Sequence, residues 1–383
     1  MSYRLFPRLL ALLLAVLPVL SASQKPAWIP NPAGFEVHRG VNLSHWLSQR
    51  FEGYDPATYI TERDFAYIRS IGYDHVRIPI DEIEFWDDQG KPIEEAFSYL
   101  EKALAWSKAH DLRVVIDLHT VRTHHFNAEN EGGKNSLFTD PKAQDAMLDL
   151  WRQLSARLKK YPVDQVAYEI MNEPVADDPQ DWNRLVAKAA KLLRELEPSR
   201  VLIIGANRWQ QAASFPYLVV PEGDRNVILS VHTYEPLAFT HYTAGWVPSG
   251  VYRGPVQYPG VVVKPEDAKR AGLSPAVVEM MKSTEAFEHW DRARLEKTLR
   301  PAFEKAKALN LQLYCGEFGC LPTVPRKDRL AYYRDIVGIL EENGVAWANW
   351  EYKAEFGIKQ YDTKTGRESA PDEELISILV GRK

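Results

Sequence analysis

Eight short apolar runs alternate with amphipathic segments along this sequence, and this alternation constrains the fold more than any other feature. The apolar runs predict strands at residues 41–43, 75–80, 113–119, 166–173, 201–204, 227–234, 311–317 and 345–350. Helical spacing predicts helices at residues 61–70, 93–110, 141–158, 182–196, 295–309, 329–342 and 375–379, with a kink or break at Pro301. Strands that alternate with helices in this way predict a single-domain α/β fold, the (β/α)8 or TIM barrel.

An open, doubly wound α/β sheet is the weaker alternative for the same alternation. No glycine-rich phosphate loop follows any predicted strand, so nucleotide chemistry has no visible motif. Two long loops, at about residues 120–140 and 235–288, stand out between the predicted elements. Loops of this length in a compact domain are usually functional.

The first 23 residues have the pattern of a secretory signal peptide. Arg4 and Arg8 form a positive start, residues 9–20 are largely apolar, and small residues follow at positions 21–23. A membrane anchor is the alternative, but the apolar run is shorter than the roughly 20 residues that span a bilayer. We therefore expect a barrel domain at residues 24–383 that is secreted or periplasmic, with no membrane contact after cleavage.

Composition argues against several kinds of partner. The formal net charge is −5 and falls by two without Arg4 and Arg8, and no basic stripe for nucleic acid is present. The two cysteines are Cys315 and Cys320, and buried free thiols are favoured over a bridge because the geometry across a strand end is demanding. No metal-type cysteine spacing occurs, so neither a metal nor another cofactor is expected. The expected oligomeric state is a monomer.

Two glutamates, Glu173 and Glu317, close apolar runs that are predicted as strands on different sides of the barrel. Active sites of such barrels lie at the C-terminal ends of the strands. A pair of carboxyl groups there is what glycoside hydrolysis requires: one protonates the leaving oxygen, and the other attacks the anomeric carbon. Glu169 competes with Glu173 because alternation places it on the same face, but its deeper position predicts a structural charge paired with an arginine.

Other polar and aromatic residues at predicted strand ends fit the same task. Arg77 is expected to keep a nucleophilic carboxylate ionised, and Tyr234 to donate a hydrogen bond to it. The remaining strand-end candidates for sugar contacts are His119, Asn172, His232 and Trp350. Aromatic residues near strand ends are candidates for further sugar subsites: Trp46, Trp86, Trp209, Trp246 and Tyr258, with Trp209 the best placed.

With these residues in view, the chain resembles glycoside hydrolase family five, the large cellulase family of barrel enzymes, over the whole mature sequence. The family's eight signature positions are matched in order by Arg77, His119, Asn172, Glu173, His232, Tyr234, Glu317 and Trp350. The resemblance implies a retaining glycosidase with Glu173 as acid/base and Glu317 as nucleophile.

The substrate is less constrained than the chemistry. Endo-β-1,4-glucanase activity is favoured as the commonest in the family, with β-1,3-glucanase, mannanase and xyloglucanase as alternatives, and a polysaccharide or oligosaccharide as the partner. His124 and His125 lie in the first long loop, and His124 is a candidate supporting residue. Two remote alternatives are a metal-dependent hydrolase, with Asp117, His119, His124 and His125 as ligands, and a sugar-binding protein without catalysis.

Overall fold

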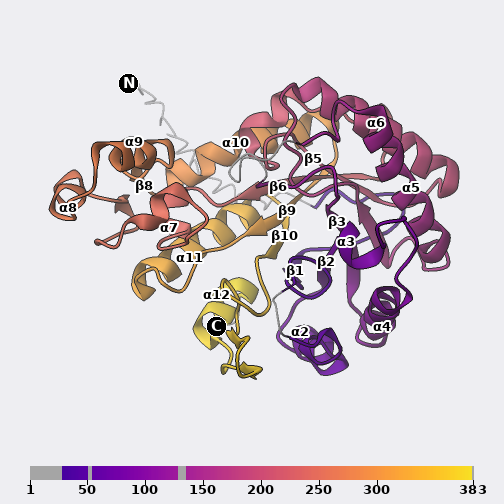
Figure 1. The fold of residues 1–383 in the computed structure, drawn as a ribbon, viewed down its shortest axis with the longest axis horizontal. Helices are drawn as coiled ribbons and strands as arrows, with labels where there is room; N and C mark the ends of the chain where they lie inside the picture. Colours follow the sequence, from indigo (N-terminus) through magenta and orange to yellow (C-terminus); the bar gives the residue numbers. More distant parts are fainter. Residues whose placement is uncertain (1–27, 51–53, 128–134, 382–383) are drawn as a thin grey trace, which may run out of the picture.

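The computed structural model describes residues 28–50, 54–127 and 135–381 of the chain. In these ranges the chain forms a closed barrel of parallel strands in the order β1-β10-β9-β6-β5-β4-β3-β2 (Figure 1). The barrel strands are β1 (Arg39–Asn42), β2 (His75–Asp81), β3 (Arg113–Thr120), β4 (Val166–Glu169), β5 (Leu202–Gly205), β6 (Val227–Thr233), β9 (Gln312–Phe318) and β10 (Ala346–Asn349). The predicted TIM barrel is confirmed.

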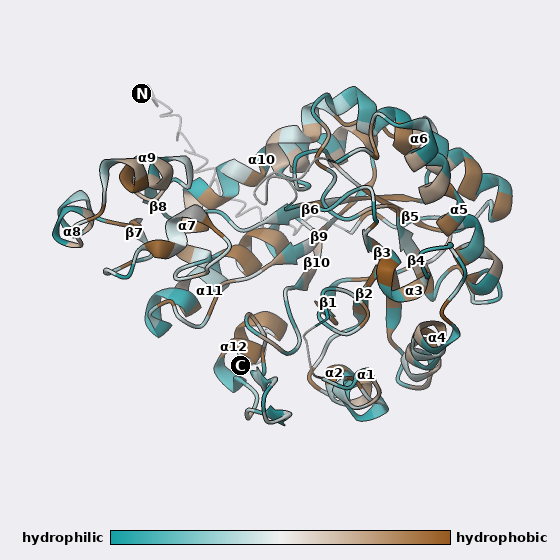
Figure 2. Cartoon of the chain, in the orientation of Figure 1, coloured by the Kyte–Doolittle hydropathy of each residue, from teal (hydrophilic) through white to brown (hydrophobic). Residues whose placement is uncertain are grey.

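Helices surround the barrel and cover its outer face. They are α1 (Pro56–Tyr59), α2 (Glu62–Ser70), α3 (Glu82–Phe85), α4 (Glu94–Ala109), α5 (Pro141–Leu158), α6 (Pro179–Leu196), α10 (Arg292–Leu309), α11 (Arg326–Glu342) and α12 (Glu373–Val380). Local chemistry explains where α5 and α6 begin. Asp140 and Asp178 each accept a hydrogen bond from a first-turn N–H, and a proline follows each cap. Hydrophobic and hydrophilic residues are interspersed along these helices, as packing on one face requires (Figure 2).

The predicted end of strand β4 is wrong, and one predicted helix break does not occur. Strand β4 ends at Glu169, four residues before Glu173, because the chain turns out of the sheet and Glu173 adopts a left-handed backbone with φ 41°. Helix α10 continues through Pro301, where a kink or break was predicted, so the helix is not broken there. A proline removes one helical hydrogen bond, but buried Leu295 and Ala302 continue one packed face on both sides of it.

The predicted loop after β6 carries secondary structure of its own. It contains α7 (Leu237–Thr240), a 3-10 turn η2 (Pro248–Val251), α8 (Pro265–Arg270), α9 (Pro275–Ser283), and the antiparallel pair β7 (Gly260–Val261) and β8 (His289–Trp290). Figure 1 shows these elements extending from one side of the barrel. Tyr258, Met281 and Trp290 are buried within the main hydrophobic core, so this insertion is packed onto the barrel.

The predicted signal peptide, residues 1–23, lies outside the described residues. No helix within the described ranges is both long enough and apolar enough to cross a bilayer. Cys315 and Cys320 are described, and both are buried free thiols.

Candidate active site

A cleft of about 800 Å³ lies where the barrel strands end. Trp209 lines it, and so do seven of the eight strand-end candidates: His119, Asn172, Glu173, His232, Tyr234, Glu317 and Trp350. The eighth candidate, Arg77, is fully buried and does not line the cleft. The barrel therefore gathers side chains from β2, β3, β6, β9 and the segments after β4 and β10 at one end of the fold.

Arg77 on β2 is the charged centre of this end of the barrel. Its Nε donates to Glu169 Oε2 at 2.6 Å, which confirms the predicted pairing of Glu169 with an arginine. Its Nη1 donates to Glu317 Oε1 at 2.7 Å, and its Nη2 lies 3.0 Å from Asp117 Oδ2 and donates to Asn172 Oδ1 at 2.8 Å. A buried guanidinium requires such compensation, because an unpaired ion in the interior costs several kcal/mol.

Glu317 lies within β9, directly opposite His232 in the register with β6. Its Oε1 accepts from Arg77, and its Oε2 accepts from the Tyr234 hydroxyl at 2.9 Å, as the sequence predicted. Burial raises the pKa of Glu317 above the usual range, while Arg77 and the Tyr234 hydrogen bond act in the opposite direction. These two contacts favour the ionised form of this carboxyl group.

Glu173 lies beyond the end of β4 in a different environment. Its backbone N–H donates to Gln210 Oε1 at 2.8 Å, which holds the left-handed turn in place. His232 Nδ1 lies 2.9 Å from Glu173 Oε1, and no arginine in the described part of the chain pairs with this carboxyl group. Burial and the nearby charge of Glu317 raise the pKa of Glu173 well above its usual range. This arrangement favours a protonated Glu173 beside an ionised Glu317.

The two carboxyl groups are close together. One carboxylate oxygen of Glu173, one carboxylate oxygen of Glu317 and a ring nitrogen of His232 lie within 4.8 Å of one another. Retaining glycosidases hold their two carboxyl groups about 5–5.5 Å apart, whereas inverting enzymes need about 6.5–9.5 Å to admit a water molecule. The spacing is therefore suited to covalent attack and proton donation on one glycosidic bond.

His119 and Trp350 form a flat surface in the cleft. Their rings stack with centroids 5.7 Å apart and planes inclined by 11°. His119 Nδ1 contacts Asp117 Oδ2 at 2.7 Å, which fixes the orientation of the ring. Burial lowers the pKa of His119 to about 4, so its imidazole is neutral near pH 7 and can exchange hydrogen bonds with sugar hydroxyl groups.

Two buried polar atoms at the cleft have no partner among the described residues: Asn172 Nδ2 and His232 Nε2. A buried polar atom without a hydrogen bond carries a cost of about 1–3 kcal/mol. Both residues line the cleft, but His232 turns Nδ1 toward Glu173 and Nε2 toward Gly316 of β9. A bound sugar is therefore in a position to supply the missing hydrogen bond of Asn172 Nδ2. Asn172 Nδ2 marks the part of the cleft where a polar ligand gains most.

The predicted aromatic subsites divide into two groups. Trp209 and Trp246 line the cleft, and the Trp246 side chain is 46% exposed. The prediction is wrong for Trp46, Trp86 and Tyr258, which are at most 1% exposed and belong to the core. Their apolar surface is used to pack helices and the insertion, and the sequence does not separate a core tryptophan from one in a cleft.

His124 is not among the residues that line the cleft. It is 1% exposed, and its ring packs edge-on against Phe138 with centroids 5.2 Å apart. In the described part of the chain, the one group of three potential ligands close enough to share a metal ion is Glu173, His232 and Glu317. The four residues of the metal-hydrolase alternative do not form such a group.

Sequence reasoning missed several residues of the cleft wall. The missed positions are His45, Gln49, Phe126, Asn127, Gln211, Glu235, Leu237, His241, Val247, Ser283, Thr284, Glu285, Glu355 and Phe356. Glu235 had a usable signal, because it directly follows Tyr234 at the end of β6. Residues 283–285 had none, because they lie at the end of a short helix far along the insertion.

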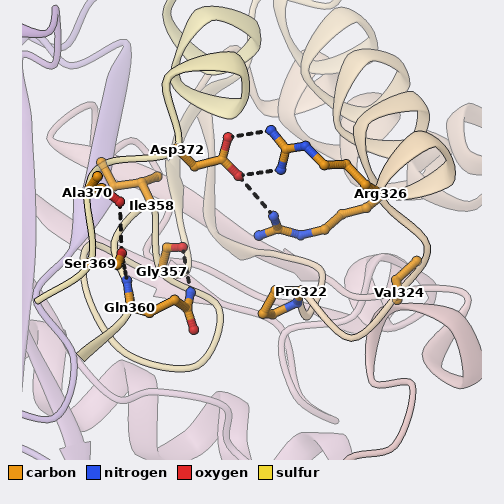
Figure 3. Close-up of a pocket in the computed structure, with 10 residues that line it drawn as sticks. Pro322, Val324, Arg326, Gly357, Ile358, Gln360, Ser369, Ala370 and Asp372 are labelled. Atoms are coloured by element: carbon orange, nitrogen blue, oxygen red, sulfur yellow. Dashed lines mark hydrogen bonds and ion pairs between the residues drawn. The ribbon is translucent and has the colours of Figure 1, made fainter. Parts of the chain in front are cut away.

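A second hollow of about 270 Å³ lies apart from the cleft and shares no lining residue with it. Figure 3 shows Arg326 at the start of α11 facing Asp372, the cap of α12. Both guanidinium Nη atoms of Arg326 donate to Asp372, at 2.7 and 2.8 Å, and Arg329 Nη1 lies 3.4 Å from the same carboxylate. These contacts hold the C-terminal helix α12 against α11, and they indicate a structural role for this hollow.

Comparison with known proteins points to the same chemistry. The sequence model of the family described as "Cellulase (glycosyl hydrolase family 5)" matches residues 22–356. Endoglucanase C of Acetivibrio thermocellus is 33% identical over 352 residues, covering 90% of this chain and 98% of the relative. Cellodextrinase A of Ruminococcus flavefaciens is 27% identical over 313 residues, covering 81% of this chain and 84% of the relative.

A solved structure agrees with the sequence relatives. Cel5A of Thermotoga maritima, in a complex with cellobiose, superposes with a TM-score of 0.70 at 26% identity, covering 91% of this chain and 98% of that one. The barrel, the carboxyl pair at its strand ends and a family match over most of the sequence lead to one assignment. This chain belongs to glycosyl hydrolase family 5, the cellulase family, and is a glycoside hydrolase.

Proposed function

We propose that this protein is a retaining endo-β-1,4-glucanase, with Glu317 as the nucleophile and Glu173 as the acid/base. The observation that carries this proposal is the unequal environment of two adjacent carboxyl groups. Glu317 accepts hydrogen bonds from Arg77 and Tyr234, whereas Glu173 is contacted by His232 and lies near the charge of Glu317. Two carboxyl groups whose pKa values are pushed apart divide into a base and an acid.

In the first step, Glu317 attacks the anomeric carbon and a covalent glycosyl-enzyme forms. The bond from the anomeric carbon to the leaving oxygen breaks, and the proton of Glu173 moves to that oxygen. As negative charge leaves Glu317, the Arg77 contact weakens, and Glu169 and Asp117 remain to neutralise the guanidinium. Asn172 Nδ2, which has no partner among the described residues, can donate to a sugar hydroxyl during this step.

In the second step, the ionised Glu173 takes a proton from a water molecule that attacks the anomeric carbon. The bond to Glu317 breaks, so the product keeps the β configuration and both carboxyl groups return to their starting states. His232 Nδ1 stays within hydrogen-bond distance of Glu173 and keeps it aimed at the same place in both steps. The stacked pair of His119 and Trp350 offers a flat surface for the reacting sugar ring.

The similarity to endoglucanase C over nearly the whole of both chains supports cellulose-type glucan as the substrate. Cellodextrinase A, which is also similar over most of its length, supports soluble cello-oligosaccharides as a second candidate on the same machinery. The insertion contributes Trp246 and the segment 283–285 to one wall of the cleft, and it is the element most able to limit chain length.

The proposal is tested by measuring reducing ends released from hydroxyethylcellulose and laminarin side by side, with Glu317→Gln as the blank. We expect release from hydroxyethylcellulose with a fast drop in viscosity, which indicates internal cuts. Release of short products alone, without a viscosity drop, would move the assignment to the oligosaccharide enzyme. Release from laminarin alone would overturn the β-1,4 assignment.

We also propose that residues 1–23 direct export and are removed, which gives a secreted or periplasmic enzyme. The support is the order of positive, apolar and small residues in the sequence. Mass spectrometry of the protein recovered from a secreting host tests this. We expect a mature chain that begins at residue 24, and an intact chain starting at Met1 would contradict it.

A further inference from the structure

The wall of the cleft is acidic and carries no lysine or arginine among the described residues that line it. Four glutamates give it this character: Glu235, Glu285, Glu317 and Glu355. A fifth, Glu173, has a raised pKa that favours its uncharged form. The histidines of the wall do not offset this charge near pH 7. Burial lowers the pKa of His45 and His119 to about 4 and that of His241 to about 3, and it lowers the pKa of His232 strongly.

The acidic groups beyond the reacting pair are weakly compensated. Glu235 Oε2 accepts from the Thr233 hydroxyl and from the Tyr234 N–H, and no ion pair of Glu235 occurs in the described chain. Glu355 is exposed and likewise has no ion pair within the described ranges. Glu285 lies 3.6 Å from Arg294, which partly screens it.

The carboxylates at the base of the cleft are largely compensated. Three carboxylates contact the single buried guanidinium of Arg77: Asp117, Glu169 and Glu317. Burial raises the pKa of Asp117 to about 7 and also raises that of Glu169, and the guanidinium offsets one charge. The negative charge that a ligand meets therefore comes mainly from the walls of the cleft. Low-dielectric walls concentrate such a field and change the local concentration of charged ligands.

We propose that this cleft selects glucan chains by charge, accepting uncharged and amino-bearing chains and disfavouring carboxylate-bearing ones. The inference rests on the proposed glucanase function and adds a substrate class to it. The partnerless Asn172 Nδ2 independently indicates a ligand that brings uncharged hydroxyl groups to the buried part of the cleft. A carboxylate brought near Glu235, Glu285 or Glu355 meets repulsion that salt screens.

The experiment compares three polymers with the same β-1,4-glucan backbone and matched substitution: hydroxyethylcellulose, carboxymethylcellulose and a quaternary-ammonium hydroxyethylcellulose. We expect raising NaCl from about 20 mM to about 500 mM to increase kcat/KM for the anionic polymer roughly three-fold relative to the neutral one. The cationic polymer should show the opposite trend, and equal salt responses of all three polymers would overturn the inference.

A double variant, Glu285→Gln with Glu355→Gln, locates the effect in the cleft. We expect it to raise the ratio of anionic to neutral turnover roughly three-fold at low salt. Its matched control, Glu195→Gln with Glu304→Gln, removes two exposed charges from the outer helices α6 and α10 and should leave the ratio unchanged. An unchanged ratio in the first variant, or an equal change in both, would overturn the inference.

The outcome is separable from that of the proposed function. If hydroxyethylcellulose is turned over and the ratio of anionic to neutral turnover is unchanged, the charge selection is refuted and the glucanase assignment is not. Absence of turnover on every polymer refutes the proposed glucanase function. In that case the charge preference can still be measured by electrophoresis of the same variants in gels that contain each polymer. Binding slows migration and needs no catalysis.

Discussion

The ends of β4 and β9 present the same side chain in two different ways. Glu317 remains inside its strand, in register with His232, and its carboxylate accepts from Arg77 of β2 and from Tyr234, which directly follows β6. Glu173 is reached only after β4 has ended, on a left-handed turn that Gln210 holds by the backbone. The two residues are chemically identical, so their different roles follow from the groups that contact them. One site favours the carboxylate and the other the carboxylic acid.

The largest expected effect comes from removing the charge at the β9 site. Glu317→Gln should lower kcat on every substrate by on the order of 10⁵-fold, because an amide cannot form the covalent intermediate. Initial rates on an aryl cellobioside and on hydroxyethylcellulose measure this. Burial disfavours ionised Glu317 in the folded state, so the variant should unfold at no lower temperature than the wild type. A variant with near wild-type turnover would end the assignment.

The corresponding change at the β4 site should depend on the leaving group. Glu173→Gln should slow polymer cleavage by on the order of 10³-fold, because the leaving sugar then departs without a proton. An activated aryl glycoside needs little protonation, so its first step should be slowed far less. Burst kinetics with a dinitrophenyl and a methylumbelliferyl glycoside separate the two cases. Equal slowing of both would contradict the acid role.

A third glutamate extends the comparison to the stability of the fold. Glu169 is fully buried, and Glu169→Ala leaves Arg77 Nε without its acceptor and removes one acceptor of Gln210 Nε2. We expect a loss of about 3 kcal/mol in the free energy of unfolding, measured by urea denaturation. Exposed Glu304→Ala on α10 is the control, with an expected change within about 0.5 kcal/mol. A Glu169 variant as stable as this control would show that the arginine does not need this partner.

The smallest effect concerns the pH profile. The Tyr234 hydroxyl lowers the pKa of Glu317 by donating to its ionised form, so Tyr234→Phe should raise that pKa. The acidic limb of kcat/KM, where Glu317 takes up a proton, should then move to higher pH while the basic limb moves less. The maximum rate should fall about ten-fold, the loss of one hydrogen bond to a charged group. An acidic limb that moves to lower pH would contradict the sign of this contact.

Much of this site could be predicted from the sequence, and the exceptions have physical causes. The barrel strands were predictable because parallel strands buried on both faces leave continuous apolar runs, as in residues 113–119. The end of β4 was not, because nothing in the sequence marks the left-handed turn at Glu173. The pairing of Glu169 with an arginine followed from the cost of a buried charge.

The walls of the cleft were harder to predict than its floor. Floor residues follow strands, and strands have a period that a sequence reveals. Trp246 and Glu285 lie on the insertion, whose short elements have no long periodic pattern, and Trp46 was misplaced because large aromatic residues serve cores and clefts alike. Substrate selection therefore depends on the part of the molecule that sequence reasoning describes least.

The central claim is the division of labour between the two carboxyl groups, and trapping the covalent intermediate tests it most directly. A cellobioside with fluorine at C2 of the reacting sugar and an activated leaving group should form the intermediate faster than water removes it. Intact mass and peptide mapping of the inactivated enzyme should then place one cellobiosyl adduct on Glu317. An adduct on Glu173, or a product of inverted configuration with no adduct, would contradict the account.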